Sequence, residues 1–114
     1  MSFLAKRDML AGMPLDIRSA ILQVLMSKTE SYGLEIIDTM KSESGGKMLA
    51  PQGRVYPALR ELEAEGFLES FEGPPLPERG GRPRRYYRIT ALGQTVARDE
   101  ARAVYGLLKP ALGV

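Results

Sequence analysis

The chain of 114 residues contains no cysteine, no histidine and no tryptophan. The absence of cysteine excludes disulfides and thiolate chemistry, and the absence of histidine removes the commonest general base. Cysteine and histidine are also the commonest zinc ligands. The chain further lacks the G-x-S-x-G, Walker A and G-x-G-x-x-G patterns. We therefore expect a protein that is not an enzyme and that uses no metal and no cofactor.

Long apolar runs are absent as well. No window holds the roughly 20 consecutive apolar residues that a membrane-spanning helix needs. After Phe3 and Leu4, the charged residues Lys6, Arg7 and Asp8 stand where a secretory signal would continue its apolar stretch. Hydrophobic residues make up 44% of the chain, which is ordinary for a globular protein. We expect a cytoplasmic protein with one core.

Charged residues separate along the chain, although the net charge is only +2. Five glutamates lie between positions 61 and 72. No acid interrupts the arginines that come next, Arg79, Arg82, Arg84, Arg85 and Arg88. Such a distribution creates a local positive surface without a large net charge. We expect the acidic stretch to be a solvent-exposed face that points away from a negatively charged partner.

Two segments before residue 50 have the apolar spacing of helices. We expect the first over about 15–27, where Asp16 favours the positive end of the helix dipole, and the second over about 32–43. Ser31 is the expected N-cap of the second helix, because its hydroxyl can accept a hydrogen bond from an early amide. A short extended segment over 47–49 is expected to follow.

A third helix is expected over about 51–65, with Gly66 as its stop. Pro57 would remove an amide donor and kink the interior of this helix. It is tolerated if the regular helix begins near Arg54, because the amides of a first turn have no partner within the helix.

A hairpin pattern comes next. Residues 67–71 and 84–89 have the composition of two strands, and the loop between them is too rich in proline and glycine to continue a ladder. Tyr87 is expected to face the core, on the side of the strand opposite to Tyr86. Since a two-stranded hairpin is marginal alone, this one must pack on the helices.

The last helix is expected to begin after Thr90, a good N-cap, and to end at about Lys109 because Pro110 follows. On one face of this helix, small and apolar residues recur at helical spacing. The small residues come first, and they let a second helix approach closely. The members of this face are Gly93, Ala97, Ala101, Val104 and Leu108. Because this face comes after a complete core, we expect a second subunit to cover it.

The order of these elements predicts the fold. Three compact helices followed by a hairpin is the order of a winged helix-turn-helix, in which the N-terminal residues of the reading helix enter the DNA major groove. We predict a mainly α fold with a small β-hairpin. A DNA-binding domain with an N-terminal helix would cover 1–90, and a C-terminal dimerisation helix would cover 91–114.

Four segments together resemble the PadR family of transcriptional regulators. In the family's order, 32–37 resembles its "YGYEL" segment, 51–59 its "PGTLYPAL", 62–68 its "LExEGLV" and 85–93 its "KYYRLTxxG". Each match alone is weak, but the set is specific. The resemblance implies a repressor that binds a pseudo-palindromic operator as a homodimer. The single C-terminal helix resembles the shorter PadR subgroup, which dimerises through that helix.

This chain departs from the family pattern on the surface expected to read DNA. Gln52 is added after the proline, and Arg54 stands where the family usually has threonine. The operator sequence is therefore not implied by the resemblance. Some members of the short subgroup bind hydrophobic or aromatic small molecules at the dimer interface. This chain has no tryptophan to stack on such a ligand, so a small-molecule effector and its identity stay open.

The expected DNA contacts lie on the third helix, which would read bases, and on the hairpin, which would grip phosphates. They are Gln52, Gly53, Arg54, Tyr56 and Arg60 on the helix, Arg79 and Arg82 on the loop, and Arg84 and Arg85 at the start of the strand that follows it. For Tyr56, a core position and a phosphate contact are both open. The expected dimer contacts are Phe3, Leu4, Ala97, Ala101, Val104 and Leu108.

A second class of function remains open. Winged helices also act as protein-interaction modules, and Leu76, among the prolines of the loop, would then be a contact. Binding to duplex DNA that weakens as salt is raised distinguishes a DNA-binding protein from such a module.

Overall fold

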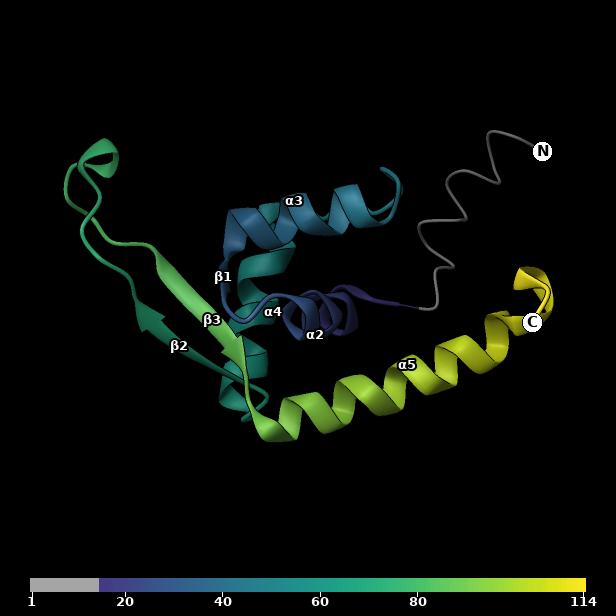
Figure 1. Ribbon diagram of the computed structural model, residues 1–114. Helices are drawn as coiled ribbons and strands as arrows, with labels where there is room; N and C mark the ends of the chain where they lie inside the picture. The colour runs from purple at the N-terminus through teal and green to yellow at the C-terminus, as the bar shows by residue number, and fades with distance from the viewer. Residues whose placement is uncertain (1–14) are drawn as a thin grey trace.

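The computed structural model describes residues 15–114 (Figure 1). Its elements are α2 (Ile17–Ser27), β1 (Ser31–Tyr32), α3 (Gly33–Glu43), α4 (Gln52–Ala64), β2 (Leu68–Glu72), the 3₁₀ turn η1 (Pro77–Arg79), β3 (Arg85–Ile89) and α5 (Ala91–Leu112). The predicted architecture, mainly helical with a hairpin after three helices, is confirmed. The expected N-terminal helix, with Phe3 and Leu4, lies outside the described residues. Within the described part, no helix has both the length and the apolarity needed to cross a membrane.

The core lies where α2, α3 and α4 meet. Ile21 and Leu25 of α2, Ile36 of α3, and Leu59 and Leu62 of α4 are almost completely buried there. Helical spacing places these residues on the inner faces of their helices. The three helices thus share one core, and Leu68 and Tyr87 of the hairpin strands are buried in it as well.

Side chains cap the first and last described helices; Thr90 is the predicted cap, whereas the sequence predicts Asp16 inside its helix. The Asp16 carboxylate accepts a hydrogen bond from the Ser19 amide at 2.8 Å. The Thr90 hydroxyl accepts one from the Gly93 amide at 3.1 Å. Each bond satisfies an amide that a helix leaves unpaired at its start.

The sheet contains a third strand that the sequence pattern does not predict. Ser31 and Tyr32 form β1, which pairs antiparallel with β3, so the strand order is β1-β3-β2. The prediction that Ser31 caps α3 is wrong, because its hydroxyl is buried and donates to the Glu35 carboxylate at 2.5 Å. Tyr32 takes the N-cap position instead. The pairing of β1 with β3 therefore fixes the start of α3 to the hairpin.

Two prolines lie inside helices: Pro57 within the helix predicted over about 51–65, and Pro110 beyond the predicted end of the last helix. α4 already begins at Gln52, so Pro57 falls beyond the first turn. α5 continues through Pro110 to Leu112 and ends at Gly113, whose φ of 77° is left-handed. Each proline removes one helical hydrogen bond, and the remaining bonds and packing hold the helix together. The segment expected to be extended over 47–49 is irregular.

α5 has two different halves. The first half packs on α2, where Ala97 is buried and its carbonyl accepts a hydrogen bond from Gln23 at 2.8 Å. The second half runs away from the other described elements (Figure 1). Its large apolar side chains Tyr105, Leu107 and Leu112 are all at least half exposed.

Candidate nucleic-acid interface

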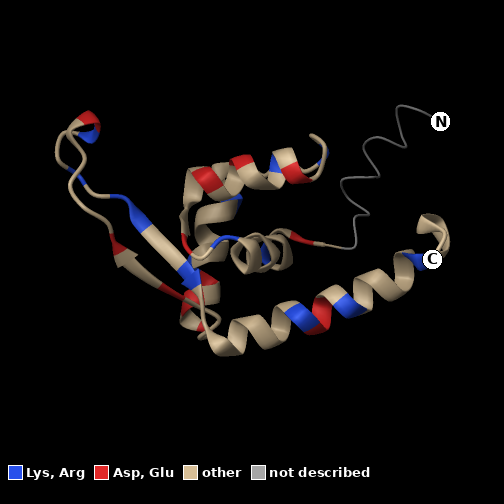
Figure 2. Cartoon of the chain, viewed as in Figure 1, with Lys and Arg blue, Asp and Glu red and all other residues tan. Residues whose placement is uncertain are grey.

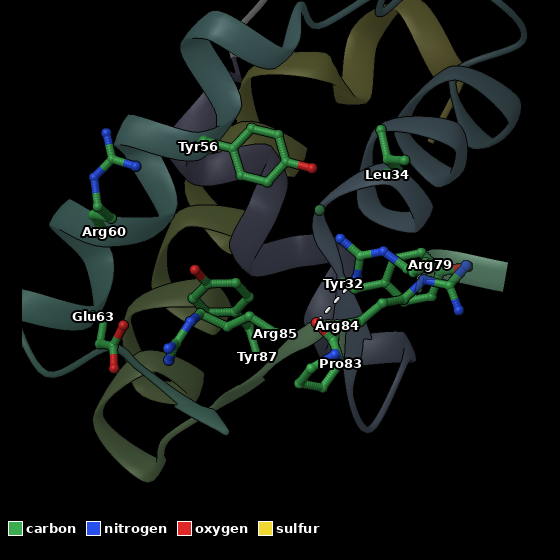
Figure 3. Close-up of a pocket in the computed structure, with 11 residues that line it drawn as sticks. Tyr32, Leu34, Tyr56, Arg60, Glu63, Arg79, Pro83, Arg84, Arg85 and Tyr87 are labelled. Carbon is green, nitrogen blue, oxygen red and sulfur yellow. Dashed lines mark hydrogen bonds between the residues drawn. The ribbon is translucent and has the colours of Figure 1, made fainter. Parts of the chain in front are cut away.

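A groove with a cavity volume of about 790 Å³ opens between α4, the start of α3 and β3. We call residues 73–88, the loop after β2 together with most of β3, the wing. The groove is lined by Tyr32, Gly33, Leu34, Tyr56, Arg60, Glu63, Arg79, Pro83, Arg84, Arg85 and Tyr87 (Figure 3). Five of the nine residues predicted to contact DNA therefore share one concave surface.

The other four predicted contact residues are exposed outside this groove. Gln52, Gly53 and Arg54 form the first turn of α4, and the latter two line a separate, smaller depression beside the start of α2. Arg54 therefore lies on a different side of α4 from Arg60. Arg82 is exposed near the tip of the wing, next to the glycines that turn the chain.

For Tyr56 the sequence leaves open both a core position and a phosphate contact, and the structure is compatible with both. Its ring is half-buried and packs against Gly33, where an added Cβ would lie only 2.5 Å from Tyr56 Cε1. Its hydroxyl points toward the groove in Figure 3. Gly33 is thus needed for the close approach of the two helices, and the phenol oxygen is available at the groove surface.

Two arginines of the wing are held at the groove by neutral groups. Arg79 Nη1 donates to the Pro83 carbonyl at 3.1 Å. The Arg84 guanidinium lies over the Tyr32 ring, 4.3 Å from its centroid. Because a carbonyl and an aromatic ring carry no net charge, neither contact neutralises the arginine that it holds.

Arg85 belongs to a chain of hydrogen bonds across the base of the hairpin. Its Nη1 donates to the Ser70 hydroxyl at 2.9 Å, and that hydroxyl donates to Glu63 Oε2 at 2.6 Å. Burial raises the pKa of the neighbouring Tyr87, and the Glu63 charge adds to this rise. The prediction that the whole acidic stretch points away from the positive surface is therefore wrong at Glu63.

Other glutamates of the acidic stretch over 61–72 form ion pairs with arginines that do not line the groove. Arg88 pairs with Glu69 at 2.7 Å, between the basic residues of β3 and the acidic residues of β2 (Figure 2). Arg18 binds Glu65 and Glu61, and its hydrogen bond to Glu65 is the main cause of its raised pKa. Arg88 is thus paired, whereas the arginines at the groove are not held by direct ion pairs in the described structure.

Three residues that hold or flank the arginines of the site were not predicted from the sequence. Tyr32 and Glu63 line the groove, and Ser70 bonds to Arg85 and Glu63 beside it. Ser70 and Tyr32 join the site through strand register, since they lie opposite Tyr87 and Tyr86 of β3. A long loop between strands leaves this register undetermined by local sequence. The available signal is the two-residue period of β2, which places Ser70 on the same face as the buried Leu68.

The α5 face predicted to form the dimer interface is divided in two. Gly93 and Ala97 are buried within their own subunit. The prediction that Ala97 faces a second subunit is corrected, because α2 already covers its side chain. Ala101 and Leu108 are exposed and Val104 is half-buried.

The helix pair α3–α4, followed by a β-hairpin and a charged wing, defines a winged helix-turn-helix protein. The Transcriptional regulator PadR-like family matches residues 21–99, about two thirds of the chain. The chain belongs to this family and is a PadR-family transcriptional regulator.

Solved structures of transcriptional regulators share the fold. A regulator from Clostridium thermocellum is similar with a TM-score of 0.67 and 25% identity, over 84% of this chain and 88% of that chain. A PadR-family regulator from Eggerthella lenta has a TM-score of 0.63 and 28% identity, over 96% and 94%. Bacillus subtilis PadR in complex with operator DNA has a TM-score of 0.62 and 28% identity, over 72% of this chain and 44% of that chain.

Proposed function

We propose that this protein represses transcription by binding a pseudo-palindromic DNA operator as a homodimer. The observation that carries the proposal is the groove on which Arg60, Arg79, Arg84 and Arg85 converge from α4 and the hairpin. Contacts between such cations and phosphates supply most of the affinity of proteins for DNA. The complex of the related Bacillus subtilis PadR with operator DNA supports duplex DNA as the partner.

The two DNA-facing elements would have different tasks. The first turn of α4, with Gln52 and Arg54 exposed, is suited to reach base edges in the major groove. The wing, with Arg82 near its tip, is suited to grip the backbone. Glu63 would face DNA unfavourably by itself, but its hydrogen bond from Ser70 links it to Arg85.

The second half of α5 supports the homodimer. Its exposed apolar residues have no cover among the described residues of one subunit. A two-fold axis through α5 would bury the same face on both subunits, as closed dimers require. Such a dimer would place its two reading helices about one DNA turn apart, roughly 34–36 Å. A small-molecule effector, if the regulator uses one, would release DNA by changing this distance.

The test removes three wing cations in the variant Arg82→Ala/Arg84→Ala/Arg85→Ala. Affinity for every duplex should fall. The slope of log K against log salt should become shallower by about 5.4, since the dimer loses three phosphate contacts on each subunit and each contact changes the slope by about 0.9. The measurement is a salt titration of duplex binding by fluorescence anisotropy. An unchanged slope contradicts the proposal that the wing contacts phosphates.

The matched control removes the same charge from α5 in the variant Arg98→Ala/Arg102→Ala/Lys109→Ala. These three residues share one side of the helix, outside the stripe of Ala101 and Leu108. The control should keep the wild-type slope. A protein-interaction module would instead show no salt-dependent duplex binding in any of the three proteins.

A further inference from the structure

The dipeptide Tyr32–Gly33 contacts both of the elements that we propose to face DNA. The Tyr32 ring supports the Arg84 guanidinium of the wing at 4.3 Å from its centroid. The next residue, Gly33, leaves just enough room for the Tyr56 ring of α4, since an added Cβ would lie 2.5–2.7 Å from ring atoms of Tyr56. Two adjacent residues thus contact an arginine of the wing and the Tyr56 ring of α4 (Figure 3).

The Tyr32 ring is itself fixed by the sheet. It lies opposite Tyr86 in the register of β1 and β3, and the two rings meet edge to face at 5.5 Å. Tyr86 in turn stacks on Phe71 of β2 at 5.7 Å and an interplanar angle of 17°. This row of three rings crosses all three strands. Tyr32 is therefore a fixed platform rather than a mobile surface side chain.

A fixed platform matters for a wing arginine. A free arginine on a loop samples many rotamers, and ordering it when DNA binds costs conformational entropy. An aromatic face attracts the guanidinium without neutralising it. Arg84 can therefore be held at the groove before DNA arrives and still keep its full charge for a phosphate.

We propose that Tyr32 is a positioning residue for DNA binding: it holds Arg84 at the groove in the orientation in which that guanidinium meets the DNA backbone. This inference rests on the proposed function of the chain. Tyr32 acts through Arg84 and through no contact of its own with DNA.

A double-mutant cycle tests the inference. Tyr32→Leu should weaken binding about two- to fivefold per subunit, the range that a partly exposed cation–π contact implies, and therefore about 4- to 25-fold for the dimer. Tyr32→Phe keeps the ring and should bind like the wild type. If Tyr32 acts through Arg84, Tyr32→Leu/Arg84→Ala should bind no more weakly than Arg84→Ala alone. Additive losses, or wild-type binding by Tyr32→Leu, overturn the inference.

A second measurement covers the case in which Tyr32→Leu does not fold. In the wild-type protein, NMR should show the δ-protons of Arg84 shifted upfield by the ring current of Tyr32, both free and bound to a duplex. Loss of this shift on binding, or its absence in the free protein, overturns the inference. If the wild type binds no duplex at all, the proposed function itself fails; if it binds but the cycle is additive, only the role of Tyr32 fails.

Discussion

Gly93 is the described glycine at which substitution by alanine should destabilise the fold most. It lies in the first turn of α5, where the chain from the sheet meets the turn before β2. The Thr90 amide donates to the Phe67 carbonyl at 3.0 Å, and the Thr90 hydroxyl donates to the Gly66 carbonyl at 2.7 Å. A Cβ on Gly93 would lie 2.2 Å from the Phe67 oxygen and 2.7 Å from Ile89 Cγ1.

The size of the effect follows from what the methyl group meets. Ile89 can move, but the Phe67 carbonyl belongs to the backbone and carries the bond from Thr90. Overpacking of this kind costs about 1–3 kcal/mol, and a weakened hydrogen bond adds about 1 kcal/mol. The better helix propensity of alanine returns about 1 kcal/mol. We expect Gly93→Ala to lower the free energy of unfolding by about 2 kcal/mol.

Equilibrium unfolding in urea measures this change, and Gly106→Ala is the matched control. Gly106 lies in the same helix, its Cβ would meet nothing within 4 Å, and it faces roughly opposite to Leu108. The free energy of unfolding of the control should rise by about 0.5–1 kcal/mol from helix propensity alone. An unfolding midpoint for Gly93→Ala equal to or above that of the wild type would refute the packing argument.

Three further predictions concern the dimer, base reading and pH. Ala101→Glu places an unpaired charge on the exposed face of α5 and should yield monomers without operator binding; a fully dimeric variant in analytical ultracentrifugation would contradict the interface. Arg54→Ala should cost about 1–3 kcal/mol on the preferred duplex if Arg54 pairs with guanine, and much less on unrelated DNA; equal losses in anisotropy titrations would make Arg54 a backbone contact. Burial raises the pKa of Tyr87 above its usual value of about 10, so its contribution to stability is complete below about pH 10 and is lost as pH rises through the folded-state pKa; Tyr87→Phe should flatten the alkaline decline measured by urea unfolding, and an unchanged decline would exclude this cause.

Local signals in the sequence were sufficient for the helices and the hairpin. The sequence predicts Thr90 as an N-cap and Asp16 as an acid at the positive end of a helix dipole, and in the structure each accepts a bond from the amide three residues later. The signals were insufficient where the outcome depends on distant parts of the chain. Ser31 has the chemistry of a cap, but pairing of β1 with β3 draws it into the sheet. Pro110 has the chemistry of a stop, but one missing hydrogen bond does not end a long helix.

The same distinction applies to the candidate site. The cluster of wing arginines is visible in the sequence, because charge and glycine content are local properties. The partners that hold two of them, Tyr32 for Arg84 and Ser70 for Arg85, are 52 and 15 residues away. They become neighbours only when the three strands pair in one register. Which arginines are held at the groove, and by what, therefore required the structure.

The most direct test of the account is selection of bound sequences from random duplex DNA by the full chain. We predict enrichment of a pseudo-palindrome whose two half-sites lie about 10 base pairs apart, centre to centre, as a two-fold dimer with one reading helix per subunit requires. Enrichment of a single, non-repeated site would contradict the dimer. Recovery of no preferred sequence, together with binding that does not respond to salt, would contradict the central claim that this chain is an operator-binding regulator.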